Sequence, residues 1–368
     1  MLHSHLRDCL ASILPRRSAL RRWLVQADLR MERARHTLAS HLPVVIHPQP
    51  RRLEIAVTSA CNLRCMGCRY GRDFMPNQQL PWRIIRPLLD DAKTAGIWSV
   101  RFYGGEPLLH HDLATMVEHS VALKMRPYVT TNAVLLEKKI DDLYRAGLRD
   151  LTIGFYGVGA MYDGYVQRTD QFRRVEGGIA AVRSRYGAEV NLRINWLLRR
   201  QTCTVEDLRA TWEFAERYHL AMQVDLIHYS LPYFTEGPDR CLQFTPDDAE
   251  AIHRVTSELV ALKQRYPDRV TQSVTALRSI PDWLLKGPGM KVPCDSYQMI
   301  WVGADGTVQL CYVTFKLGNL HAQRLSTMLF GSRHAEAARD SFLLNCPNCH
   351  CHYDTRIQKH TPSLRRYA

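Results

Sequence analysis

The stretch Cys61-Asn-Leu-Arg-Cys65-Met-Gly-Cys68 places three cysteines at C-x3-C-x2-C spacing. It follows the apolar run Leu53-Glu-Ile-Ala-Val, which is typical of a short buried strand. Thiolates held this closely by a loop that leaves a strand indicate a metal site. Iron–sulfur cubanes normally take four cysteines, so three ligands leave one iron open to another group. At this point a zinc site completed by a remote residue and three unrelated buried thiols remain alternatives.

Further along the chain, Gly104-Gly105-Glu106-Pro107 closes the second predicted strand. These two motifs, in this order and on these elements, resemble the radical S-adenosylmethionine (radical SAM) superfamily over residues 50–230. One departure is Gly67, where the family usually has an aromatic residue. The resemblance implies that Cys61, Cys65 and Cys68, here called the first cysteine set, bind a [4Fe–4S] cluster. It also implies that S-adenosyl-L-methionine (SAM) is bound by Gly104, Gly105, Glu106, Pro107, Asn132 and Asn195.

Asn132 and Asn195 enter this group from their positions on predicted strands. Thr130-Thr131-Asn132 ends the third strand and resembles the family's TTN segment. Arg193 and Asn195 share one side of the fifth strand by period-two alternation. His228, at the end of the sixth strand, is a further candidate for a contact with ribose or substrate. The alternative for all of them is a buried polar residue satisfied by nearby backbone. No catalytic residue is assigned.

Composition fits a globular protein of 368 residues, with 46% hydrophobic and 23% charged residues. We expect one large α/β domain and a small second one. No apolar run approaches the roughly 20 residues of a membrane span, and the N-terminus lacks the apolar core of a signal peptide. A cytoplasmic protein is therefore expected, in which the eleven cysteines serve metal ligation rather than disulfides. The net charge of +13 suits acidic partners without choosing among them.

Residues 1–48 are predicted to form a basic helical extension. Its arginines are concentrated at Arg16, Arg17, Arg21, Arg22, Arg30, Arg33 and Arg35. Apolar residues recur at helical spacing at Leu20, Trp23, Leu24, Ala27, Met31, Ala34 and Leu38. We expect this amphipathic helix to dock on the core, with binding to a membrane surface or a partner as the alternative.

Residues 49–230 alternate between strand and helix patterns. Strands are predicted at 53–59, 98–103, 127–131, 150–156, 189–197 and 222–229. Helices are predicted at 82–95, 113–124, 135–146, 172–186 and 205–218. Six such repeats predict a parallel sheet, and the resemblance implies a partial (β/α)6 TIM-like barrel. A helical linker is expected over 231–290, where Thr245-Pro246-Asp247-Asp248 is a helix start.

A second cysteine set consists of Cys294, Cys311, Cys346, Cys349 and Cys351. The runs 297–302 and 307–310 flank Ala304-Asp305-Gly306, which predicts a hairpin. From the residues alone, these cysteines suit a zinc ribbon as readily as a cluster. The order C-x11-G-x4-C followed by C-x2-C resembles the SPASM or shortened twitch extensions of radical SAM enzymes. This implies a small C-terminal domain over 291–355 with one auxiliary [4Fe–4S] cluster, bound by Cys294, Cys311, Cys346 and Cys349. Cys351 is the alternative fourth ligand, and 356–368 is expected to be a basic tail.

The resemblance implies an enzyme that reductively cleaves SAM and abstracts a substrate hydrogen through the 5′-deoxyadenosyl radical. Oxidation or rearrangement of a small molecule is the first hypothesis, because one auxiliary cluster can accept an electron from a substrate radical. Maturation of a ribosomally made peptide is the second. A non-catalytic, metal-stabilised nucleic-acid-binding protein is a remote third, so no nucleic acid is expected as a partner. The implied electron donor is a flavodoxin or ferredoxin.

Overall fold

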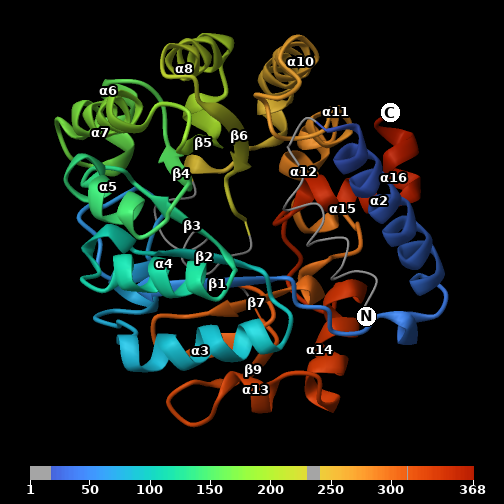
Figure 1. The fold of residues 1–368 in the computed structure, drawn as a ribbon. Helices are drawn as coiled ribbons and strands as arrows, with labels where there is room; N and C mark the ends of the chain where they lie inside the picture. The colour runs from blue at the N-terminus through green and yellow to red at the C-terminus, as the bar shows by residue number, and fades with distance from the viewer. Residues whose placement is uncertain (1–17, 230–240, 313) are drawn as a thin grey trace.

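The computed structural model describes residues 18–229, 241–312 and 314–368. One nine-stranded sheet runs through it in the order β6-β5-β4-β3-β2-β1-β7-β8-β9 (Figure 1). Each strand from β6 to β7 is parallel to its neighbour, whereas β8 and β9 are antiparallel. The sheet has two edges, at β6 and β9, so it forms an open, partial barrel. The predicted fold class is confirmed.

The strands are β1 (Arg52–Thr58), β2 (Ser99–Gly104), β3 (Arg126–Thr131), β4 (Asp150–Phe155), β5 (Asn191–Leu198), β6 (Ala221–Leu226), β7 (Met299–Val302), β8 (Thr307–Gln309) and β9 (Lys316–Asn319). All six strands predicted for the barrel are confirmed. In β6, Met222, Val224 and Leu226 are buried, whereas Gln223 and Asp225 are partly exposed. Because alternate side chains of a strand point to opposite faces, the apolar face packs under the helices and the polar face lines the barrel interior.

Helices cover the outer side of the barrel (Figure 1). They are α3 (Trp82–Thr94), α4 (Leu113–Ala122), α5 (Leu136–Arg145), α6 (Ala160–Val166), α7 (Gln171–Tyr186) and α8 (Val205–Arg217). Each of the five predicted helices is present, and α3 shows the reason, since Ile85, Leu88 and Leu89 recur at helical spacing and are buried. Helix α6 was not predicted. It is short and lies directly after a loop with two positive-φ glycines, Gly157 and Gly159.

The C-terminal part extends the same sheet. The remaining helices are α10 (Ala249–Arg265), α11 (Val274–Arg278), α12 (Ile280–Lys286), α13 (Leu325–Met328), α14 (Ser332–Leu343), α15 (Tyr353–Lys359) and α16 (Thr361–Arg366). The predicted hairpin is confirmed as β7 and β8. Its first strand also pairs with β1, from Arg52 opposite Met299 to Ile55 opposite Val302. The auxiliary segment therefore shares a sheet with the barrel and is not separated from it at the predicted boundary.

Two predicted segments differ from the structure or lie partly outside it. The expected basic tail is folded into α15 and α16, and Arg356 and Lys359 in it are buried rather than exposed. The start of the predicted linker, residues 231–240, lies outside the described residues, as do residues 1–17 of the predicted extension. The helix start at Thr245 is confirmed by a capping box with Asp248.

The N-terminal helix α2 (Ala19–Ala39) is confirmed, and it docks on the C-terminal part of the chain, but not through its apolar stripe. Along that stripe Leu20, Trp23, Met31 and Leu38 are exposed, Trp23 by 63%. The buried face is polar instead, and carries Glu32 and His36. No helix in the described residues is long and apolar enough to cross a membrane.

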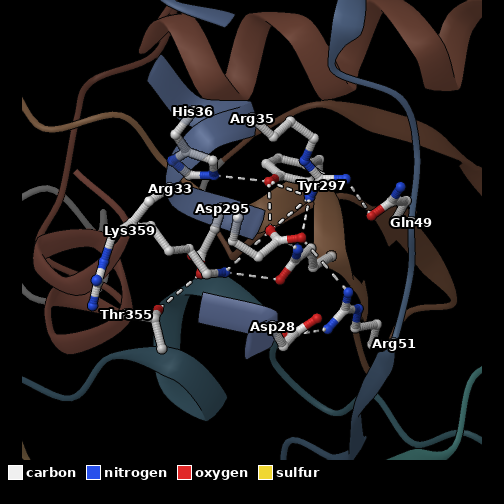
Figure 2. Close-up of polar contacts among 12 residues, drawn as sticks. Asp28, Arg33, Arg35, His36, Gln49, Arg51, Asp295, Tyr297, Thr355 and Lys359 are labelled. Atoms are coloured by element: carbon white, nitrogen blue, oxygen red, sulfur yellow. Dashed lines mark hydrogen bonds and ion pairs between the residues drawn. The ribbon is translucent and has the colours of Figure 1, made fainter. Parts of the chain in front are cut away.

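Figure 2 shows why the polar face is buried. His36 Nε2 and Tyr297 Oη lie 2.9 Å apart, and the Arg35 guanidinium donates to the same Tyr297 hydroxyl at 2.9 Å. Glu32 accepts from Arg35 at 2.6 Å and from Gln298 Nε2 at 2.8 Å. These contacts tie α2 to the residues that follow Cys294. The helix therefore holds the loop of the second cysteine set.

Candidate metal centres and cofactor site

The first cysteine set leaves the carboxyl end of β1 on a loop held by backbone hydrogen bonds. Met66 N–H donates to Tyr165 O at 2.8 Å, and Arg64 N–H donates to Val166 O at 3.2 Å, so the loop rests on the end of α6. Arg72 donates to the carbonyl oxygens of Cys65, at 3.0 Å, and Cys68. These contacts close the loop around its three thiols. Neither α6 nor the role of Arg72 was predicted, because no motif in the sequence marks them.

Gly67 explains the departure from the family pattern at the position before Cys68. Its φ is 76°, in the left-handed region where a side chain is disfavoured. The loop turns at this residue, and Cys68 N–H then bonds back to Cys65 O at 3.2 Å. The backbone conformation itself thus favours glycine here.

The three cysteines lie at a partly open site, where Cys61 is exposed and Cys65 and Cys68 are half-buried. Desolvation of its thiol by the surrounding loop raises the pKa of Cys61 to about 11. Burial, reinforced by Cys68 and Cys61, raises the pKa of Cys65 well above its usual value. Thiols with such pKa values are protonated at neutral pH, and a coordinated cation is what would make them thiolates. The donor set therefore fits a metal centre.

Gly104 and Gly105 bring the end of β2 against the residues that precede Cys61. Gly105 N–H donates to Thr58 O and Glu106 N–H donates to Ala60 O, both at 2.8 Å. A Cβ at position 104 would lie 2.3 Å from Thr58 O, and one at 105 would lie 2.3 Å from Ala60 O. The approach that these glycines permit is thus to the backbone of β1, beside the cysteine loop.

Glu106 is fully buried, and both of its carboxylate oxygens already accept hydrogen bonds. Thr131 Oγ1 donates to Oε1 at 2.7 Å, Leu108 N–H donates to the same oxygen at 3.0 Å, and Asn132 N–H donates to Oε2 at 2.7 Å. Burial raises its pKa to about 7, against the lowering effect of these bonds. The side chain fixes the segment 131–132 and does not face an open space. Pro107 is buried beside it in a short 3-10 turn.

Asn132 reaches the cysteine loop, whereas Asn195 is engaged elsewhere. Asn132 Nδ2 donates to Asn62 Oδ1 at 2.8 Å and lies 3.9 Å from Cys61 Sγ. Asn195, on β5, donates from Nδ2 to Asp225 Oδ2 on β6 at 2.8 Å. The structure therefore brings Asn132 and the Gly-Gly backbone to the first cysteine set, and places Asn195 beside Asp225.

The five thiols of the second cysteine set line one small pocket, together with Asn348 and His352. The Cys351 thiol forms a hydrogen bond with the Cys349 sulfur, and this hydrogen bond lowers the pKa of Cys349 to about 5. Burial opposes the lowering, whereas Arg356 and His228 add to it. The same pairing raises the pKa of Cys351 well above its usual value. Of the two candidate fourth ligands, Cys349 is thus the one whose surroundings favour the thiolate form.

Arg356 supplies a buried positive charge at this pocket. It is 0% exposed and donates to the carbonyl oxygens of Cys349 and Val292 and, at 3.2 Å, to Asn348 Oδ1. In the described part of the chain no carboxylate pairs with it within 4.0 Å. Because a buried charge is costly unless it is compensated, an anionic group is expected beside it. Cysteine-ligated iron–sulfur clusters are anionic. In the sequence, the one feature that points to Arg356 is its position soon after the last cysteine.

Thiol spacing distinguishes a cluster from a single zinc ion. Tetrahedral zinc with bonds of about 2.3 Å to sulfur draws its thiolates together, whereas a cluster places each thiolate on a different iron. Among the described residues, no three cysteine thiols lie within 4.8 Å of one another. Both cysteine sets are therefore spread more widely than a single zinc ion requires.

A hollow of about 840 Å³ lies at the other end of the barrel, at the amino ends of the strands. It is lined by the first residues of β2 to β6, which are Ser99, Arg126, Asp150, Asn191 and Ala221. Arg193 lines it, whereas none of the residues predicted to bind SAM or a cluster does. Sites of such barrels form at the carboxyl ends of strands, so this hollow is not part of the candidate site.

Comparison with known proteins matches residues 55–198 to the family model of the radical SAM superfamily. The matched segment contains the first cysteine set, Gly104-Gly105-Glu106-Pro107 and Asn132. The chain contains a radical SAM domain. Its radical SAM domain implies a [4Fe–4S] cluster and SAM as cofactors.

Among curated proteins, this chain is similar to GTP 3′,8-cyclases over part of its length. The alignment with the protein of Mycolicibacterium smegmatis has 34% identity over 138 residues. It covers 36% of this chain and 38% of the relative. The chain is 36% identical over 137 residues to the protein of a Mycobacterium species, with 36% and 39% covered. The chain thus spans less than two fifths of the length of these relatives.

Solved structures share the fold over most of the chain. SuiB of Streptococcus suis, bound to its precursor peptide SuiA, has a TM-score of 0.63 at 16% identity, covering 83% of this chain and 70% of that one. The protein anSMEcpe with bound AdoMet and the Kp18Cys peptide has a TM-score of 0.62 at 17% identity, covering 84% and 88%. At these identities the likeness concerns the fold.

Proposed function

We propose that this radical SAM protein is an enzyme that cleaves SAM reductively at the first cysteine set and transforms a small polar molecule. The observation that carries the proposal is the convergence of Cys61, Asn132 and the Gly104-Gly105 backbone at the carboxyl ends of β1 to β3, inside the matched domain. When bound there, the cluster and SAM supply a hydrogen-abstracting radical.

In this proposal each site residue has a distinct part. Cys61, Cys65 and Cys68 bind the first cluster, and Asn132 holds Cys61 through its amide. Gly104 and Gly105 keep side chains out of the space beside the loop, so that backbone groups contact SAM. Glu106 acts as a positioning residue, because its oxygens hold Thr131 and Asn132. Asn195 would contact SAM or substrate from β5.

We propose a second, auxiliary [4Fe–4S] cluster at Cys294, Cys311, Cys346 and Cys349. Its support is the shared pocket, the low pKa of Cys349 and the buried charge of Arg356. Four protein ligands leave no iron of that cluster open, which suits electron transfer rather than substrate binding. Tyr312, next to Cys311, bonds to Glu54 and, at 3.0 Å, to Arg101 inside the barrel. The second cysteine set is thereby joined to the barrel interior.

The substrate class follows from the barrel lining. Residues facing the interior include Glu54, Arg101, Asn195 and Asp225, so a small polar substrate is favoured over an apolar one. A peptide is the second candidate, because the peptide-bound SuiB and anSMEcpe structures share this fold. A flavodoxin or ferredoxin would supply the electron.

We keep residues 49–230 as the proposed core and 291–355 as the proposed auxiliary segment, joined by the pairing of β1 with β7.

The test is reductive SAM cleavage by the anaerobically reconstituted full-length protein. With dithionite as reductant, the wild type should release 5′-deoxyadenosine, and a Cys61/Cys65/Cys68→Ala variant should release none. A Cys203→Ala variant is the matched control, since Cys203 is buried outside both cysteine sets. Equal release from the wild type and the triple variant would contradict the proposal. Candidate sugars, amino alcohols and peptides can then be compared by their stimulation of product formation.

A further inference from the structure

Three side chains with metal-binding chemistry meet where the carboxyl end of β6 faces the second cysteine set. They are Asp225 on β6, His228 just beyond it, and His350 between Cys349 and Cys351. One ligand atom from each lies within 4.8 Å of those of the other two. The fold brings them together across more than a hundred residues of sequence, so no sequence motif marks them.

His350 has the orientation of a ligand. It is 2% exposed, and its Nε2 lies 2.9 Å from Leu226 O. Because a carbonyl oxygen only accepts, Nε2 carries the hydrogen and Nδ1 carries the lone pair. Within the described residues that buried Nδ1 has no hydrogen-bond partner. Metal-bound histidines commonly donate their other ring N–H to a backbone carbonyl, as Nε2 does here.

The other two side chains are oriented as well. Asp225 accepts from Asn195 Nδ2 at 2.8 Å through Oδ2 and from Leu226 N–H at 3.1 Å through Oδ1, which fixes the carboxylate. The His228 ring stacks on that of His350, with centroids 4.4 Å apart and planes at 26°. Partners of this kind around potential ligands are what a preorganised metal site needs.

We propose that Asp225, His228 and His350 bind one divalent transition-metal ion. Two imidazoles and one carboxylate form a nitrogen and oxygen donor set that suits Zn²⁺, Fe²⁺ or Mn²⁺, and differs from the all-sulfur sets of the two clusters. Three protein ligands leave a coordination position open, as in metal sites that bind water or a substrate oxygen. The inference rests on these residues and not on the proposed SAM cleavage.

Zinc is the probe. The full-length protein, with its clusters reconstituted anaerobically, is given one equivalent of Zn²⁺, desalted, and analysed for zinc and by X-ray absorption at the zinc edge. The expected result is about one zinc per chain with only nitrogen and oxygen ligands near 2.0–2.1 Å. Sulfur at about 2.3 Å would assign the zinc to cysteines and overturn the proposal. Failure to retain zinc would overturn it as well.

Variants assign the site. Asp225→Asn and His228→Ala should lose the zinc, and Asn195→Ala, which removes only the orienting amide, should weaken binding by about 10–100-fold. His111→Ala is the control, because His111 belongs to a second histidine and aspartate group but its side chain is 75% exposed. Unchanged iron content and cluster absorbance show that each variant is folded. Zinc retained in both Asp225→Asn and His228→Ala would contradict the assignment, whatever the result for SAM cleavage.

Discussion

At the scale of single residues, the tight contact between the end of β2 and the cysteine loop depends on glycine at position 105. In Gly105→Ala the new Cβ would meet Ala60 O at 2.3 Å and Ser59 O at 2.5 Å, so the backbone beside Cys61 must move. We expect a loss of about 1–3 kcal/mol in unfolding free energy and less iron in the first cysteine set. Denaturant unfolding and iron analysis measure both.

Gly164→Ala in α6 is the matched control for this substitution. Its Cβ meets no atom within 4 Å, and alanine favours the helix by up to about 1 kcal/mol. If both variants unfold at the same denaturant concentration as the wild type, the close approach at position 105 is not required.

Glu106→Gln tests whether this residue acts on SAM directly or through its neighbours. The amide nitrogen would replace one acceptor, leaving a buried donor from Thr131, Asn132 or Leu108 without a partner. We expect a stability loss of about 1–3 kcal/mol without SAM, together with weaker SAM binding by calorimetry. The exposed Glu118→Gln should change neither. Weaker SAM binding at unchanged stability would instead indicate a direct contact.

Cys349→Ala and Cys351→Ala distinguish the two candidate fourth ligands. Because Cys349 has the lowered pKa, its loss should remove about four irons, those of the second cluster, while SAM is still cleaved at the first. Cys351→Ala should keep both clusters. Iron analysis and low-temperature EPR report the outcome. A cluster lost in Cys351→Ala and kept in Cys349→Ala would reverse the assignment.

Residue spacing in the sequence predicted much of the candidate metal and cofactor site, but not all of it. Both cysteine sets and Gly104-Gly105 were visible because a cluster and a close backbone approach require those residues within one short loop or strand end. Arg356, Arg72 and the group around His350 were not, because their partners come from distant segments. The motif alone suggested that Glu106 contacts SAM directly. In the structure its carboxylate instead accepts hydrogen bonds from Thr131 and Asn132, which the motif does not reveal.

At the scale of elements, α2 shows how a correct helix can be given the wrong face. Its apolar spacing predicted the helix, but the buried side is set by Tyr297, Gln298 and Lys359, more than 250 residues away. Likewise, the β7–β8 hairpin followed from its turn residues, whereas the pairing of β7 with β1 had no local signal. Local patterns determine elements, and long-range contacts determine their neighbours.

His36 makes the docking of α2 dependent on pH. Burial, and next the positive charge of Lys359, lower the pKa of His36 to about 3 from an ordinary 6.5, while Asp295 opposes this and Arg35 adds to it. The unfolded chain therefore binds a proton below pH 6.5 that the folded chain does not. Stability is complete above that pH and falls as the pH drops towards 3, by up to about 1.4 kcal/mol per pH unit.

Unfolding measured from pH 7.5 to 5.5 tests this contribution. His36→Gln should flatten the fall in stability relative to the wild type. His41→Gln, at an exposed histidine just past the helix, should leave it unchanged. Parallel curves for wild type and His36→Gln would show that the histidine is not buried as the structure places it.

At the scale of the whole molecule, one sheet carries both cysteine sets. The first follows the carboxyl end of β1, and Cys294 precedes the neighbouring β7, which pairs with β1 in parallel. Helix α2 and the C-terminal α15 then fasten the second set through Tyr297 and Asp295 (Figure 2). The two cysteine sets are therefore joined by one continuous sheet.

The most direct test of the central claim is ⁵⁷Fe Mössbauer spectroscopy of the anaerobically reconstituted wild type, with iron and zinc analysis. We expect about eight irons per chain, all in [4Fe–4S] signals, about four in a Cys61/Cys65/Cys68→Ala variant and none when the second cysteine set is also replaced. Stoichiometric zinc with four irons or fewer in the wild type would contradict it.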